Sequence, residues 1–177
     1  MIINILRVFY ICVAILFFGC EHEKPSVKAT LARSLIRNVA KNLEQRYQLR
    51  FIGFSESADK AYYNKIGLRF STYRILRKEE GREILIESAE HLMNEINSNT
   101  DLQPYLNPYP FTAANVEVVI FVHKQDESSV YYPNIAVFAA WSERVEYKTK
   151  IEEVKYGYYT EEEESYEEAL KIVRSQN

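Results

Sequence analysis

An apolar run near the amino terminus does not fit into a water-soluble fold, whereas the rest of the chain does. The run, VFYICVAILFF at 8–18, carries no charge and leads through a glycine to Cys20. Apolar side chains would cover every face of a helix made from it, so it lacks the polar stripe of a surface helix. A membrane span needs about 20 apolar residues, and extending the run backwards includes Asn4 and Arg7. The pattern favours a secretory leader over an uncleaved anchor, and both over a buried core helix.

The cysteine that ends the run belongs to a known type of motif. The residues LFFGC at 16–20 resemble the lipobox of bacterial prolipoproteins, with Phe17 and Phe18 differing from the residues usual there. The resemblance implies that the Cys20 thiol receives a diacylglycerol, that cleavage falls directly before it, and that the freed amine is open to acylation. Glu21 follows, where an aspartate would commonly signal inner-membrane retention in a Gram-negative host. The outer membrane is therefore slightly favoured.

These patterns predict three parts in the chain. Residues 1–19 would be the signal peptide, 20–26 the lipidated cysteine with a short tether, and 27–177 a single globular domain. A tether of this length reaches less than about 20 Å when fully extended. The protein is expected to be lipid-anchored in the cell envelope with its domain close to the membrane. An uncleaved signal-anchored form and a secreted interaction protein remain as alternatives.

Charge and cysteine content exclude several classes of protein. The 177-residue chain has a net charge of −3, and its Lys and Arg residues form no cluster. It therefore lacks the positive surface of a nucleic-acid-binding protein and the polybasic patch that binds anionic lipids. Of its two cysteines, Cys12 lies inside the leader. Neither a disulfide framework nor a cysteine-based metal cluster is expected.

Hydrophobic periodicity predicts helices and strands along the rest of the chain. Apolar residues recur at helical spacing in three segments and alternate or cluster in five shorter ones. The fold class is α+β, with a mixed, largely antiparallel sheet of about five strands and helices packed on one face, in the order α-β-β-α-β-β-β-α. The expected helices are 26–49, 78–99 and 160–175, and the expected strands are 50–55, 66–76, 115–123, 130–141 and 144–152.

No catalytic or cofactor motif stands out. Five glycines leave no phosphate-binding loop, and the three histidines lack metal-ligand spacing. The run EEEE at 161–164 is assigned to the first turn of the last helix, where the helix dipole favours acids, rather than to a calcium loop. The chain is therefore expected to be non-enzymatic, without cofactor or metal. The alternative is an envelope hydrolase with a site assembled from scattered residues such as Ser55, Glu117 and His123.

Tyrosine is the one unusual feature of the composition, with fourteen in the chain. Tyrosine offers rigid amphipathic contact area, so tyrosines in loops could recognise an envelope protein or a cell-wall glycan. The competing and favoured interpretation is a sheet rich in cross-strand aromatic pairs. The candidate binding surface consists of Tyr105, Tyr109, Phe111, Tyr131 and Tyr132.

Overall fold

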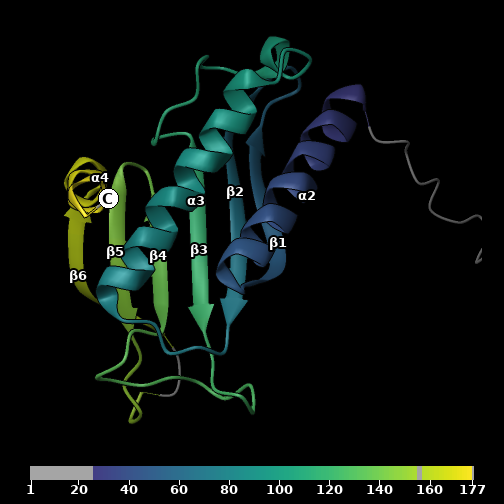
Figure 1. The fold of residues 1–177 in the computed structure, drawn as a ribbon. Helices are drawn as coiled ribbons and strands as arrows, with labels where there is room; N and C mark the ends of the chain where they lie inside the picture. The colour runs from purple at the N-terminus through teal and green to yellow at the C-terminus, as the bar shows by residue number, and fades with distance from the viewer. Residues whose placement is uncertain (1–25, 155–156, 177) are drawn as a thin grey trace, which may run out of the picture.

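The computed structural model describes residues 26–154 and 157–176, so the leader and Cys20 lie outside the described part of the chain. Figure 1 shows the arrangement of helices and strands. The elements are α2 (Val27–Tyr47), β1 (Arg50–Ala58), β2 (Tyr63–Thr72), α3 (Lys78–Ser98), the short 3-10 helix η1 (Gln103–Tyr105), β3 (Val116–Val122), β4 (Val137–Trp141), β5 (Arg144–Thr149), β6 (Tyr159–Ser165) and α4 (Tyr166–Ser175).

The six strands form one sheet whose spatial order follows the chain from β1 to β6 (Figure 1). β2 and β3 run parallel, and every other neighbouring pair is antiparallel. A parallel pair needs a long crossover connection, which α3 provides here. The predicted α+β class with a mixed, largely antiparallel sheet is confirmed, with six strands in place of about five.

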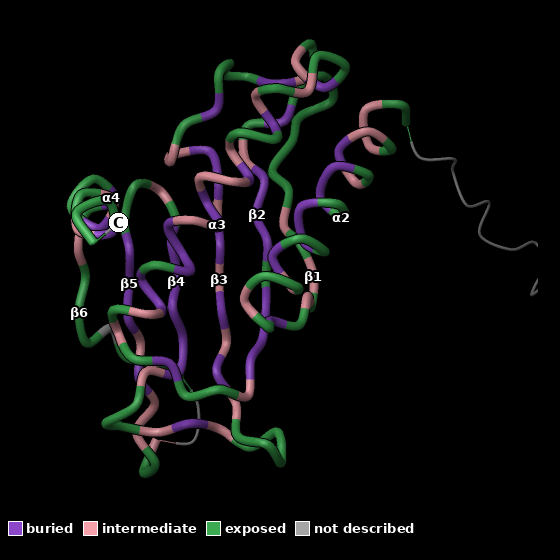
Figure 2. The backbone as a smooth tube through the Cα atoms, in the orientation of Figure 1, coloured by how far each residue is buried: buried purple, intermediate pink, exposed green. Residues whose placement is uncertain are grey.

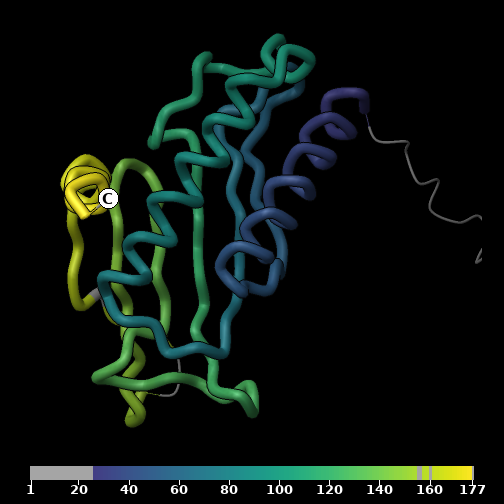
Figure 3. The backbone as a smooth tube through the Cα atoms, viewed as in Figure 1, coloured from purple at the N-terminus to yellow at the C-terminus, as the bar shows by residue number. Residues whose placement is uncertain are grey.

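The α-helices of the described residues, α2, α3 and α4, lie on one face of the sheet, as the path of the backbone in Figure 3 shows. α2 packs on β1, α3 crosses β3 and β4, and α4 lies against β5 and β6. Between the layers is a buried apolar core, drawn in purple in Figure 2. Strands supply alternate residues to it because successive side chains point to opposite faces. β2 and β3 contribute Ile66, Leu68, Phe70, Val116, Val118, Ile120 and Val122.

The first two predicted helices are confirmed. Ser26 caps α2, since its hydroxyl accepts a hydrogen bond from the backbone N–H of Ala29 at 3.2 Å. The buried stripe of α2 is Ala32, Leu35, Ile36, Val39, Ala40 and Leu43. α3 buries its own stripe against the sheet, and Gly81 in its first turn lies directly against the ring of Phe138 on β4.

The C-terminal prediction was wrong in part. Instead of one helix over 160–175, the chain forms β6 and then α4, so no helix begins at Thr160, where the sequence predicted a capping box with Glu163. The box forms at the true helix start, where Ser165 Oγ accepts from the Glu168 N–H at 3.2 Å and Glu168 Oε2 accepts from the Ser165 N–H at 3.2 Å.

Tertiary pairing explains why the four glutamates of β6 adopt a strand. Successive side chains of a strand alternate between faces, so each glutamate is offered a different partner. These partners and the pairing with β5 outweigh the helix preference of glutamate. Glu161 accepts from Thr149 Oγ1 at 2.8 Å, Glu162 pairs with Lys78 at 2.5 Å, Glu163 with Arg144 at 3.0 Å, and Glu164 with Arg82 at 2.7 Å.

The face of the sheet away from the helices carries charge pairs. Val119 and Phe121 of β3 are half-buried at its centre. Around them long charged side chains cover apolar surface with their aliphatic stems. The pairs are Arg69–Glu117 at 3.5 Å, Arg144–Glu163 at 3.0 Å and Glu146–Lys148 at 2.5 Å.

The sheet gives the molecule two distinct ends. At the upper end of Figure 1, α2 begins, β1 turns into β2, and the segment 99–115 leads from α3 to β3. At the lower end, the segment 123–136 joins β3 to β4, β5 leads into residues 150–154, and β6 begins. α2 has 21 residues, which gives it a length of about 32 Å and fixes the scale of the separation between the ends.

Gly81→Ala is expected to lower the free energy of unfolding by about 1–3 kcal/mol. Replacing glycine inside a helix by alanine normally stabilises it by about 1 kcal/mol. Here, however, a Cβ on Gly81 would stand 2.1 Å from Cε1 of the buried Phe138, so the ring must move. Urea unfolding measures the change, with the exposed Glu83→Ala of the same helix as control. A stabilised Gly81→Ala variant would contradict this packing.

Candidate functional site

The structure divides the predicted aromatic surface between the two ends of the molecule. Tyr105, Tyr109 and Phe111 belong to the segment before β3, whereas Tyr131 and Tyr132 belong to the segment after it. β3 has seven residues, so about 23 Å of strand separates the two groups. Phe111 is only 2% exposed and packs in the core. The five residues therefore do not form one surface, and Phe111 is not open to a partner.

At the lower end, Tyr131 and Tyr132 line a pocket of about 380 Å³. We call this the lower pocket. Two backbone hydrogen bonds fix the segments that form the pocket. The Tyr132 N–H donates to the carbonyl of Lys150 at 2.9 Å, and the Ala136 N–H donates to the carbonyl of Lys148 at 2.8 Å. The pocket is thus built where the strand-like segment before β4 pairs with the end of β5. Its walls are Tyr131, Tyr132, Ile151, Glu152, Glu153 and Glu161.

Glutamates line the lower pocket, while nearby lysines contact the ring of Tyr131. Among the residues that the structure describes, the lining of the pocket contains three glutamates and no basic side chain. Two lysines of the described residues contact Tyr131, because Lys124 Nζ lies 5.9 Å and Lys150 Nζ 5.6 Å from the centre of its ring. Lys150 Nζ also donates to Ser129 Oγ at 2.7 Å. The pocket itself is therefore acidic.

This lining defines the chemistry of a suitable ligand. Carboxylates accept hydrogen bonds and attract cations, and tyrosine faces bind cations through the ring quadrupole. The side chain of Ile151 adds an apolar contact. A group that carries positive charge and N–H donors on a partly apolar stem, such as a lysine or arginine side chain, fits this lining. An anionic ligand would be repelled.

Of the three residues considered for a hydrolase, the sheet brings Ser55 and Glu117 close together but leaves His123 apart. Ser55 pairs with Gly67 in the sheet and Gly67 with Glu117, so Ser55 and Glu117 flank the same glycine. His123 follows β3 at its other end, six residues beyond Glu117, which is about 20 Å along a strand. A base so far away cannot take a proton from Ser55.

Several tyrosines have a structural role that the sequence did not reveal. In each of three clusters, a tyrosine hydroxyl donates to a glutamate that also pairs with an arginine. The clusters are Tyr47–Glu87–Arg46, Tyr147–Glu164–Arg82 and Tyr166–Glu90–Arg174. Burial raises the pKa of all three tyrosines, and the neighbouring glutamate raises it further. These hydroxyls remain protonated donors through the physiological pH range.

Cross-strand aromatic pairing accounts for less than expected. Among the described residues, the rings of Phe51 and Phe70 lie tilted against each other across β1 and β2 with centroids 5.7 Å apart, and Phe138 meets Tyr147 edge-on across β4 and β5 at 5.9 Å. Only the second pair contains a tyrosine. The buried tyrosines serve chiefly to join elements through glutamate and arginine.

Within residues 26–154 and 157–176, no group of three His, Asp or Glu side chains gathers in a way that could hold a metal ion. His91 lies on α3 and His123 after β3, while His22 falls outside the described residues. None of the helices in that same part of the chain is both long and apolar enough to span a bilayer.

The acidic half of the lower pocket was missed by sequence reasoning. Glu152 is the last residue of the strand expected over 144–152, Glu153 lies outside the expected elements, and Glu161 belongs to the helix expected over 160–175. The available signal was the pairing of the segments before and after the hairpin at Ser142 and Glu143, which brings residues near 132 beside those near 150. Comparison of the chain with protein-family models, curated proteins and solved structures found no match.

Removing Arg82 is expected to lower the free energy of unfolding by about 3 kcal/mol, since the change leaves Glu164 charged and nearly enclosed. Side-chain exposure in this pair is 9% and 15%. Removing Arg144 from the more exposed Glu163, one residue earlier in β6, should cost less than about 1 kcal/mol. Chemical denaturation of Arg82→Met and Arg144→Met compares the two directly.

The double variant Arg82→Met/Glu164→Gln should recover part of the loss, because it removes the uncompensated charge and leaves an acceptor for the Tyr147 hydroxyl. Equal costs for Arg82→Met and Arg144→Met would contradict the assignment of Arg82 as a buried partner.

Proposed function

We propose that this chain is a bacterial envelope lipoprotein, anchored through acyl chains on Cys20, whose domain binds a partner and is non-enzymatic. The LFFGC motif at 16–20 carries the anchoring part of the proposal. One acyl chain holds a protein only marginally, whereas two or three on one cysteine give durable attachment. The motif precedes the first residue of α2 by only a few residues.

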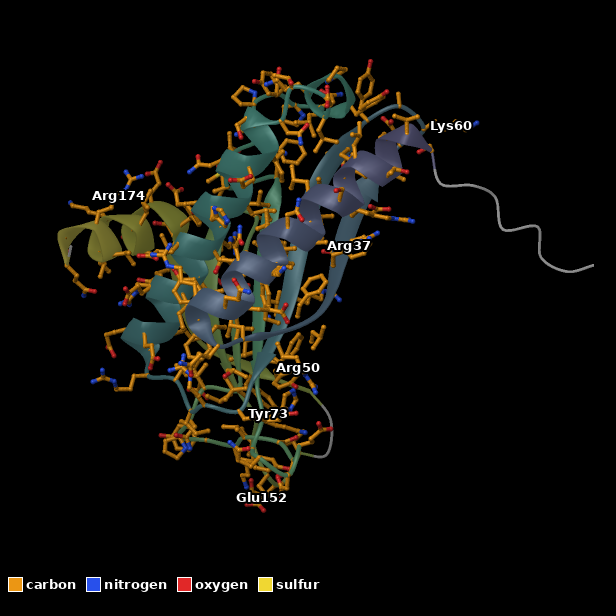
Figure 4. The ribbon with its side chains drawn as sticks, turned by 45° about the vertical axis from the view of Figure 1, so that its right-hand side comes forward. Arg37, Arg50, Lys60, Tyr73, Glu152 and Arg174 are labelled. Carbon is orange, nitrogen blue, oxygen red and sulfur yellow. The ribbon has the colours of Figure 1, made fainter. Side chains whose placement is uncertain are left out.

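The position of the lower pocket supports the binding part of the proposal. α2 begins at the upper end, and the pocket lies at the other; Figure 4 marks this separation with Lys60 near the start of α2 and Glu152 far below it. A tether at the upper end would therefore leave the pocket facing away from the membrane. An acidic, tyrosine-lined pocket in that position suits a partner in the envelope space.

The partner that fits best is an envelope protein with an exposed basic segment. Glu152, Glu153 and Glu161 would pair with its lysines or arginines, and Tyr131 and Tyr132 would pack along their stems. Exposed ion pairs contribute about 0.2–1 kcal/mol each. Binding by a single basic group would be weak, so a segment with several is expected. A cell-wall glycan offers the tyrosines a stacking surface but gives the carboxylates no cation.

Cys20→Ala is expected to abolish lipidation and move the protein out of the detergent phase in a partition assay. The reason is that the acyl chains supply the membrane affinity, about 0.8 kcal/mol for each buried methylene. Mass measurement of the native protein should find an N-terminus at Cys20 that carries the added lipid.

Cys12→Ala is the matched control, because it changes a cysteine within the leader and should leave lipidation intact. Recovery of Cys20→Ala in the detergent phase with Met1 retained would establish an uncleaved anchor instead. Recovery of the native protein without lipid in the medium would establish a secreted form.

Neutralising the lower pocket should weaken binding of a short oligolysine peptide by about fivefold to tenfold, the effect of losing two exposed ion pairs. The variant is Glu152→Gln/Glu153→Gln, and titration of the lipidated protein in detergent micelles measures the dissociation constant. Added salt should weaken binding to the native protein by screening.

The control variant Glu79→Gln/Glu83→Gln removes the same net charge from the exposed face of α3. An equal loss in this control would show a nonspecific charge effect and contradict a binding role for the pocket. A chitin oligosaccharide that binds while oligolysine does not would also contradict it and indicate a glycan-binding protein.

A further inference from the structure

Three segments at the upper end form one continuous surface. Lys28 Nζ, in the first turn of α2, donates to the carbonyl of Asp59 in the β1–β2 turn at 3.0 Å. The same ammonium lies 4.8 Å from the centre of the Tyr63 ring. The N–H of Asn107 then donates to the carbonyl of Tyr63 at 2.8 Å. The start of α2, the β1–β2 turn and the segment 99–110 are thereby fixed to one another.

This surface, which we call the upper face, exposes apolar and aromatic side chains. Val27 is 69% exposed, Tyr62 41% and Tyr109 50%. The prolines of the segment 104–110 are also exposed. Tyrosine is enriched where a protein meets the interfacial region of a bilayer, since its ring is apolar and its hydroxyl polar.

The charges of the upper face balance one another. Lys28 and Lys60 are matched in number by Asp59 and Asp101. The Asp59 carboxylate accepts from the N–H groups of Ala61 and Tyr62 at 2.7 and 2.6 Å, which lowers its pKa and keeps it ionised. Without net positive charge, this face has no electrostatic preference for anionic lipid. Contact with a membrane would rest on its aromatic and apolar side chains.

The other surfaces are less suited to lie on lipid. The helix-free face of the sheet exposes Trp141, but around it lie the charge pairs Arg69–Glu117, Arg144–Glu163 and Glu146–Lys148. Placing such pairs against hydrocarbon would remove water from both charges of each pair. The lower end has exposed tyrosines as well, but there they adjoin Glu152 and Glu153. These carboxylates would be repelled by a surface of anionic lipids.

We propose that the upper face docks on the interfacial region of the membrane that holds the acyl chains of Cys20, an inference that rests on the proposed lipid anchor. The domain then stands with the lower pocket directed away from this membrane. Five residues separate Cys20 from Ser26, which limits their separation to about 20 Å. This tether keeps the upper face at a high local concentration near the lipid, so a weak contact is sufficient to orient the domain.

The test uses the lipidated protein in phosphatidylcholine vesicles that contain a nitroxide-labelled lipid. Because acylation consumes the Cys20 thiol, a cysteine introduced by Lys60→Cys or by Glu152→Cys is the only free thiol of the mature chain and accepts a fluorescent label. Nitroxide quenching is short-ranged, and the two positions lie at opposite ends of strands about 20–30 Å long. Quenching should be at least about threefold stronger at position 60 than at position 152.

Tyr109→Ser and Tyr132→Ser form a matched pair, since each replaces an exposed tyrosine that precedes a proline. Tyr109→Ser should reduce quenching at position 60 by about half or more, because the tyrosine anchors are few. Tyr132→Ser should leave it unchanged. Adding anionic lipid should not increase the quenching at position 60.

The outcomes separate the two proposals. A lipidated protein with equal quenching at positions 60 and 152, or with no response to Tyr109→Ser, overturns the docking of the upper face and leaves the lipoprotein assignment standing. A native protein that carries no lipid and does not sediment with vesicles overturns the lipoprotein assignment and the docking with it. Quenching that is stronger at position 60 than at position 152, and that Tyr109→Ser reduces while Tyr132→Ser does not, supports the docking.

Discussion

The position of α3 across the middle of the sheet is the constraint on which the rest of the structure depends. As the crossover between β2 and β3, it must lie on one face, and it carries the polar contacts that join the other elements to it. Glu87 meets Tyr47 and Arg46 of α2, Glu90 meets Tyr166 and Arg174 of α4, and Arg82 meets Glu164 of β6. Each contact satisfies a charge that burial would otherwise penalise.

This arrangement places the helices on one side and leaves both ends of the sheet to loops. The connections at each end add side chains such as Phe111 and Val130 to the core, and they also carry exposed tyrosines, such as Tyr109 above and Tyr132 below. The two ends differ in charge. Acidic side chains line the lower pocket, while Lys28, Lys60, Asp59 and Asp101 balance at the upper face. The same residue type can therefore serve different surfaces.

Sequence patterns predicted the elements whose stability is local or strongly periodic. α2 and α3 follow from their apolar stripes, and the hairpin at Ser142 and Glu143 follows from the alternation on either side of it. β6 could not be predicted in the same way, because the run EEEE favours a helix by itself and becomes a strand through its pairing with β5 and with the distant side chains of Lys78 and Arg82. The lower pocket depends on this strand, so its acidic wall was missed for the same reason.

The high tyrosine content now has two separate explanations. The half-buried Tyr47 and the buried Tyr147 and Tyr166 donate to glutamates, and replacing their hydroxyls would leave carboxylates short of a partner. Tyr62, Tyr109 and Tyr132 have no such burial and expose ring surface to water. Stability accounts for the first group and leaves the second unexplained. Contact of an exposed ring with a lipid interface or a partner lowers the free energy of the system, so selection for function would act on the second group.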